Sequence, residues 1–215
     1  MKNSHHFLTL CLILTASFTS LAQQIDTEYE TQKKSILKME FFSPLTGHTT
    51  FGYERYIKDW VSWEAKLGII GLGVDQEDFN GFDKNSAGLL LRGGPKFKLN
   101  PDFVTRDLRG SHLLSGKYIR PEIVASVYSE DEIVFTNSGD ETIRKNYNSF
   151  ALLINYGRQY VLADIMSIDY HVGVGYGFDN YNGNDGGKYH HSHTLGDSSF
   201  PIAFSAGFTI GVLLK

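Results

Sequence analysis

Histidines gather near the C-terminal end of the sequence, at positions 189–193 (YHHSH). Neutral imidazole nitrogens are common ligands of transition metals, so His190, His191 and His193 are candidate metal ligands. The surrounding residues are typical of an exposed polar loop, which lacks the neighbouring groups that orient metal-binding histidines. A polar loop without a metal is the simpler interpretation, and we expect no cofactor.

The same segment carries the residue types of a lipid hydrolase. Ser192, His190 and Asp179 could supply a nucleophile, a base and an orienting acid. However, the sequence contains no Gly-x-Ser-x-Gly elbow, and a serine near a histidine is common by chance in polar loops. We therefore expect a protein that is not an enzyme, with a lipid-modifying hydrolase as an alternative.

A second set of ionisable residues is spread along the chain at alternating positions. Successive side chains of a β-strand point to opposite faces, so these residues would share one face of a sheet. Five are basic and five are acidic, and His171 lies beside them. Equal numbers of opposite charges favour an internal polar network. The set is Lys38, Glu40, Glu54, Glu64, Lys66, Arg92, Lys96, Arg120, Glu122, Asp169 and His171.

Large apolar residues occupy the positions between these polar residues. The pattern is clearest at residues 166–178 and 202–214, where large apolar side chains alternate with small or polar ones. Similar alternation surrounds residues 37–41, 51–53, 63–69, 89–97, 119–127 and 150–156. Strands of roughly 8–13 residues suit a tilted crossing of a bilayer. The sequence therefore predicts an all-β fold, an eight-stranded antiparallel up-and-down transmembrane β-barrel with the polar residues inside.

The predicted connections alternate between short and long. They are brief at 58–60 and 163–165 and long at 73–86, 129–148 and 179–198. Short turns at one rim and long loops at the other are typical of outer-membrane barrels. Two connections depart from this pattern, because the loop at 43–48 is brief and the turn at 100–115 is long enough for a short helix around 102–108.

Two arginines disturb the apolar face. Arg55 and Arg158 fall on it, close to predicted short turns, where an arginine can reach lipid headgroups or where a bulge resets the alternation. The same alternation also suits a soluble lipocalin-like barrel, in which the apolar residues would surround a ligand cavity. Glycines on the polar face of the last two strands favour the membrane barrel, because small residues suit a crowded interior.

The N-terminus has the features of a secretory signal peptide. A weakly basic start precedes an apolar stretch that ends with small residues, and we expect cleavage after Ala22. Residues 23–34 form a polar lead-in and residues 35–215 the barrel domain. The only cysteine, Cys11, lies within the signal peptide, so disulfides cannot stabilise the mature domain. Removing Lys2 leaves 19 basic and 24 acidic residues, and this net charge of −5 argues against a nucleic-acid partner.

Four stretches carry a resemblance to a known group of proteins. Positions 51–56 (FGYERY), 93–97 (GGPKF), 116–122 (GKYIRPE) and 204–214 resemble small, largely uncharacterised outer-membrane β-barrel proteins of Bacteroidota, which share the OmpA/OmpX-type eight-stranded barrel. The resemblance implies location in a Gram-negative outer membrane, contact with its lipid, and a structural or surface-contact role. Long external loops would meet an unknown extracellular or envelope partner. No catalytic residue is implied, and the terminal Lys215 departs from the aromatic ending of many such barrels.

Overall fold

The computed structural model describes residues 32–58, 60–74, 85–100, 112–136, 139–180, 191, 193 and 201–215. From Gln32 onward the chain forms one compact unit. The predicted signal peptide, most of the lead-in and the predicted helix around 102–108 lie outside the described residues. Among the residues described, no helix is both long and apolar enough to cross a membrane.

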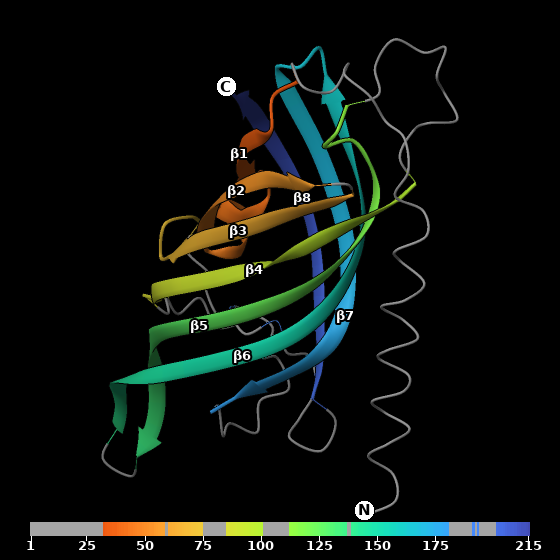
Figure 1. Cartoon of the computed structure of the whole chain (residues 1–215). Helices are drawn as coiled ribbons and strands as arrows, with labels where there is room; N and C mark the ends of the chain where they lie inside the picture. Colours follow the sequence, from red (N-terminus) through yellow and green to blue (C-terminus); the bar gives the residue numbers. More distant parts are fainter. Residues whose placement is uncertain are drawn as a thin grey trace, which may run out of the picture. The chain divides into compact units, whose positions relative to one another are not determined.

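Eight strands form a closed barrel (Figure 1). Each strand pairs antiparallel with its sequence neighbours, and β1 closes the ring against β8. This confirms the predicted eight-stranded antiparallel fold. A short 3-10 helix, η2 (Ser43–Thr46), connects β1 to β2. The strands are β1 (Ser35–Glu40), β2 (His48–Lys58), β3 (Val61–Ile70), β4 (Ala87–Asn100), β5 (Gly116–Thr136), β6 (Gly139–Leu162), β7 (Met166–Asp179) and β8 (Ile202–Leu214).

Alternation along the strands decides which side chains enter the barrel. In β3, Trp63 and Leu67 are exposed on the outer wall, whereas Glu64 and Lys66 are buried inside. The same division holds along β7, where Val172 and Val174 are exposed and Asp169 is buried. The apolar residues therefore face outward, which is opposite to the lipocalin-like alternative.

The two ends of the barrel differ in their connections. We call the end with η2 and the β3–β4, β5–β6 and β7–β8 connections the loop end. The opposite turn end holds the β2–β3, β4–β5 and β6–β7 connections. At this end Ala163 and Asp164 both adopt left-handed backbone angles, with φ of 52° and 54°. Two such residues in succession match the tight hairpin turns that join twisted strands, and the predicted short connection is present.

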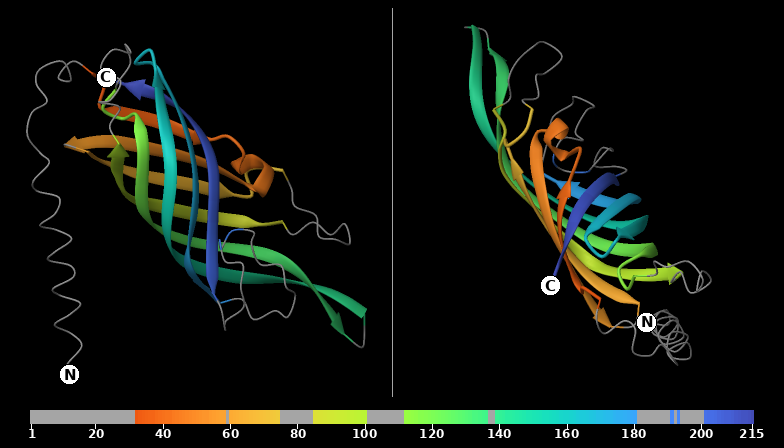
Figure 2. Two further views of the ribbon diagram at one scale, coloured as in Figure 1. Left: turned by 90° about the vertical axis from the view of Figure 1, so that its right-hand side faces the viewer. Right: turned by 90° about the horizontal axis from the view of Figure 1, so that it is seen from above.

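The segment predicted as a loop at 129–148 is a β-hairpin instead, and that prediction was wrong. β5 and β6 remain paired from Ser129 opposite Asn146 to Thr136 opposite Gly139, and the hairpin extends beyond the other strands (Figure 2). Charge complementarity contributes to the pairing at the base of this extension. Asp131 lies opposite Arg144, and their side chains form an ion pair at 2.9 Å. Such cross-strand pairs stabilise the two strands by a modest amount.

The two arginines on the outer wall lie near the turn end, as expected. Arg55 is exposed and precedes a shift in the β2–β3 register between Tyr56 and Lys58. Arg158 lies over the ring of Tyr160, with its guanidinium carbon 4.7 Å from the ring centroid. Ile57, at the irregularity, is exposed like Tyr53 and Arg55, so the alternation continues through it and is not reset.

Apolar clusters flank the polar centre of the barrel. Towards the turn end, Ile36, Leu114 and Leu213 pack together with Tyr56 and Val161. The larger cluster lies on the β3–β6 side and includes β8 through Ala203. It comprises Ile70, Leu90, Val124, Tyr128, Tyr147, Ala151, Leu153 and Ala203.

Candidate functional site

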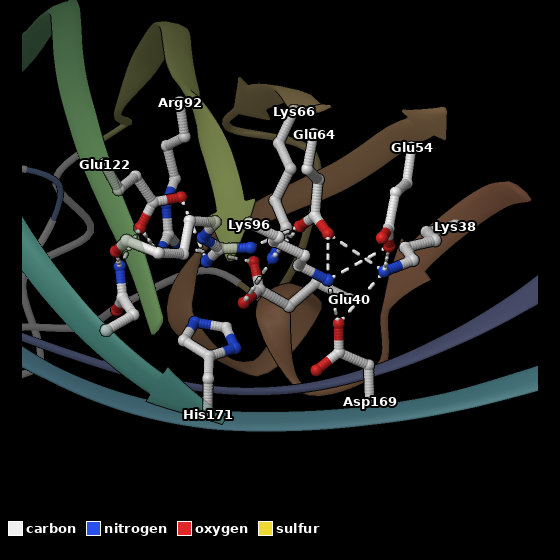
Figure 3. A network of polar contacts seen from close by, with 12 residues as sticks. Lys38, Glu40, Glu54, Glu64, Lys66, Arg92, Lys96, Glu122, Asp169 and His171 are labelled. Atoms are coloured by element: carbon white, nitrogen blue, oxygen red, sulfur yellow. Dashed lines mark hydrogen bonds and ion pairs between the residues drawn. The ribbon is translucent and has the colours of Figure 1, made fainter. Parts of the chain in front are cut away.

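The structure brings the eleven predicted polar residues together inside the barrel. Each of them is at most 5% exposed. They come from β1, β2, β3, β4, β5 and β7, and their side chains converge on the same interior space (Figure 3). The alternation of the strands places them there, because every second residue of each strand points inward. The interior therefore holds a continuous polar network.

One half of the network surrounds two lysine ammonium groups. Lys96 Nζ lies 2.6 Å from Asp169 Oδ2, 2.5 Å from Glu64 Oε2 and 3.0 Å from Glu54 Oε2. Lys38 Nζ contacts the same three carboxylates and lies 2.9 Å from both Glu64 and Asp169 (Figure 3). Buried charges are stable only when they are paired and hydrogen-bonded, and these five residues meet that requirement.

These carboxylates are also the group among the described residues that could hold a metal ion, with ligand atoms of Glu54, Glu64 and Asp169 within 4.8 Å of one another. Lys38 and Lys96 hydrogen-bond to these oxygens. Together with Arg120, which pairs with Glu64, these two lysines already neutralise the group, and its chemistry is that of an internal ion-pair cluster.

Three residues of this half were absent from the predicted set. Gln159 accepts hydrogen bonds from both Lys38 and Lys96, and Tyr118 donates its hydroxyl to Asp169 Oδ1 at 2.7 Å. Lys98 is buried as well and donates to the carbonyl of Leu114 at 2.6 Å. All three occupy inward positions of their strands. The alternation could have found Lys98 and Tyr118, because they lie two residues from Lys96 and Arg120 on the same face of their strands.

The other half of the network centres on Arg92. Its guanidinium donates to both carboxylate oxygens of Glu122, at 3.2 and 2.9 Å, and to Ser205 Oγ at 2.8 Å. Arg120 links the two halves, because it contacts Glu64 at 2.5 Å and Glu122 at 3.1 Å. A paired guanidinium and carboxylate form strong, directional hydrogen bonds.

Glu40 is the exception in this half. It lies 3.6 Å from Arg92 Nη1 and 3.7 Å from Lys66 Nζ, and neither of its carboxylate oxygens has a hydrogen-bond partner among the described residues. His171 Nε2 lies 3.4 Å from Ser205 Oγ, while its Nδ1 atom has no such partner.

The structure describes two of the three candidate metal-binding histidines. His191 packs edge-on against Tyr128 and His48, with ring centroids 5.1 and 5.7 Å away. His193 Nδ1 lies 3.2 Å from the carbonyl of Phe204. Both are buried, at 2% and 9% exposure, so the exposed loop expected there is wrong at these two positions.

Burial and the nearby Arg92 cation lower the pKa of His193 to about 4, which keeps its ring neutral at pH 7. His190 and Ser192 lie outside the described residues, so the metal and hydrolase hypotheses remain untested.

No family model matches the chain, and no curated protein matches it. Among solved structures, the chain is similar to the N-terminal β-barrel domain of OprF from Pseudomonas aeruginosa. The identity is 10%, the TM-score is 0.35, and the alignment covers 85% of this chain and 98% of that chain. The predicted affiliation with a Bacteroidota family stays a prediction.

Proposed function

We propose that this protein is an integral outer-membrane β-barrel with no catalytic role, which supports the envelope or its surface contacts. The observation that carries the proposal is the continuous apolar outer wall around an ionic interior. Exposed apolar surface of this extent destabilises a water-soluble monomer, whereas hydrocarbon accommodates it.

The height of this wall matches a membrane. Along β7, the outward residues run from Met166 to Phe178, which is twelve residue steps. At about 3.3 Å per residue and a tilt of about 40°, this stretch rises about 30 Å along the barrel axis. The hydrocarbon core of a bilayer is about 30 Å thick.

The outer wall is also layered. At mid-height, aliphatic Ile154 of β6 pairs with Val174 of β7. Towards the loop end, Phe150 pairs with Phe178, and towards the turn end the rings of Tyr160 and Tyr170 lie 6.4 Å apart. Aromatic rings on both sides of an aliphatic band are typical of barrels that span a bilayer, because these rings prefer the headgroup regions.

The filled interior favours a structural role over transport. Eight strands leave an interior just wide enough for side chains, and the ion-pair cluster around Lys38 and Lys96 occupies it at mid-height. A surface-contact role is supported by the β5–β6 hairpin, which extends the wall at the loop end and carries charged side chains such as Arg144 and Lys145.

The test is whether the mature protein behaves as a folded membrane barrel. We expect it to sediment with outer membranes, to require detergent for solubility, and to migrate faster on gels when unboiled than when boiled. Protease treatment of intact cells should cleave the β5–β6 hairpin and spare the barrel. A mature protein that is monomeric in buffer without detergent contradicts the proposal.

A further inference from the structure

Among the described residues, the closed barrel has a gap in its wall where β8 approaches the loop end. β1 has six residues and pairs with β8 only from Leu214 to Thr209, whereas β8 continues to Ile202 with β7 as its partner. Beyond Thr209, the side of β8 that faces β1 receives two contacts. Phe41 donates its backbone N–H to the Phe208 carbonyl, and Phe204 donates to the His193 carbonyl. Ala206 lies between them, so this stretch has no neighbouring strand on that side among the described residues.

A cavity of about 380 Å³ lies at this gap. Its lining has two chemical characters. Phe42, Ala206 and Phe208 belong to the outer apolar wall, and the rings of Phe42 and Phe208 are 5.9 Å apart. Glu40, Arg92 and His171 belong to the buried polar network. The cavity therefore joins the apolar outside of the barrel to its ionic interior.

The polar side of the cavity has unused hydrogen-bonding capacity. Glu40 is only 5% exposed, and neither of its carboxylate oxygens has a hydrogen bond within the described part of the chain. His171 is 3% exposed, and its Nδ1 atom also has no hydrogen-bond partner among the described residues. By contrast, Glu54 and Asp169 in the other half accept hydrogen bonds from both lysines. A buried carboxylate without donors is costly, which points to a ligand or water at Glu40.

A glycine leaves room for the polar side chains at this cavity. A Cβ atom on Gly207 would lie 2.4 Å from Glu40 Oε1 and 2.4 Å from His171 Cε1. Any other residue at position 207 would push these side chains away from the cavity. Metal binding is not indicated here, because Glu40 and His171 belong to no group of three candidate metal ligands among the described residues.

The charges around the cavity define the class of ligand. Of the acidic and basic residues, Glu40 and Arg92 line the cavity. Behind them, ion pairs continue to four more residues, so that the acids Glu40, Glu64 and Glu122 balance the bases Lys66, Arg92 and Arg120 and the cluster is neutral. An ionic ligand would add an unpaired charge to a buried site, whereas a zwitterion would not. An ammonium group would supply the donors that Glu40 lacks, and an adjacent phosphate would face the Arg92 guanidinium. The apolar rim would hold the hydrocarbon attached to such a head group.

We propose that the gap between β8 and η2 binds a phosphoethanolamine lipid, with its ammonium on Glu40, its phosphate towards Arg92 and its acyl chain over Phe42 and Phe208. This inference rests on the proposed membrane location, because the lipid would enter from the hydrocarbon side.

The experiment uses the full mature barrel, folded in detergent micelles and titrated with short-chain lipids. Native mass spectrometry would count bound dihexanoyl phosphoethanolamine, phosphocholine and phosphoglycerol. We expect one phosphoethanolamine per barrel, bound about tenfold more tightly than phosphocholine, whose methylated amine has no N–H donor. Equal binding of the three lipids, or none, overturns the proposal, and retention of water alone at Glu40 is then the remaining explanation.

Variants separate the site from general lipid contact. Glu40→Gln keeps the size of the side chain and should abolish the preference for phosphoethanolamine. Phe208→Ala should weaken binding, whereas the matched control Phe150→Ala, also on the outer wall, should not. Each variant is first checked for faster migration when unboiled. If the wild-type protein does not migrate faster when unboiled, the proposed function is contradicted. If it is a folded membrane barrel but shows no head-group preference, only the lipid site is contradicted.

Discussion

At the scale of single residues, the interior lysines are stable only as members of the ion-pair cluster. Lys96→Met removes one of the two cations that face Glu54, Glu64 and Asp169. Breaking a buried pair leaves uncompensated charge, so we expect a loss of about 3–5 kcal/mol in the free energy of unfolding. Arg144→Met at the exposed Asp131 pair is the control and should change it by less than about 1 kcal/mol. Urea unfolding in lipid vesicles measures both, and equal effects would contradict the network's structural role.

His193 gives the loop end a dependence on pH. Its folded pKa of about 4 lies below the ordinary value of 6.5, so the folded state binds fewer protons than the open state. The buried position of His193 is therefore fully stable above about pH 6.5 and is destabilised as the pH falls towards 4, by up to about 3 kcal/mol, because burial and Arg92 disfavour the protonated ring. We expect wild type to exceed His193→Asn in thermal midpoint at pH 7.5 and to lose that advantage at pH 4. A difference that does not change with pH would contradict this.

At the scale of elements, the β5–β6 hairpin is an extension of the wall rather than part of its core. Residues 131–144 carry none of the eleven network residues, and Glu130 lies opposite Lys145. Replacing 131–144 with Asn-Gly should therefore join the strands by a tight turn and leave the barrel folded. Gel migration of unboiled protein and the unfolding midpoint test this. A truncated chain that no longer folds would show that the hairpin guides assembly.

The strands could be predicted from the sequence wherever inward and outward residues differ in polarity. Val172 lies on the exposed outer wall and is apolar, whereas Asp169 lies in the ionic interior and is charged. The β5–β6 hairpin shows no such division, because its sequence mixes apolar residues such as Ile133 and Phe135 with charged ones, and the Asp131–Arg144 ion pair joins its strands at its base.

The candidate site was predictable only in part. Inward positions follow from the alternation, which is why Glu40 and Arg92 were found. The cavity beside them could not be predicted, because the gap at Ala206 depends on how far β1 pairs with β8. The register between β1 and β8 depends on contacts between residues far apart in the sequence, and the alternation within a single strand does not reveal it.

At the scale of the whole molecule, the ring of strands is closed and the charges of the interior network balance. The stability of the barrel therefore depends on what surrounds its outer wall. A charge placed on that wall therefore reports what surrounds it. Ile154 lies at mid-height of β6 and is 64% exposed, whereas Leu162 ends β6 at the turn end and is 49% exposed. Both side chains point away from the ion-pair network, so packing inside the barrel does not distinguish them.

Depth in the bilayer does distinguish these two positions. Ile154→Arg should cost about 2–4 kcal/mol in the free energy of folding into lipid vesicles, because hydrocarbon surrounds the guanidinium at mid-height. Leu162→Arg should cost about 0–1 kcal/mol, because the side chain can extend to the headgroups. If water surrounded the wall, both substitutions would be nearly neutral and would raise solubility. Equal and small costs at the two positions would therefore contradict the membrane location even if the barrel itself were intact.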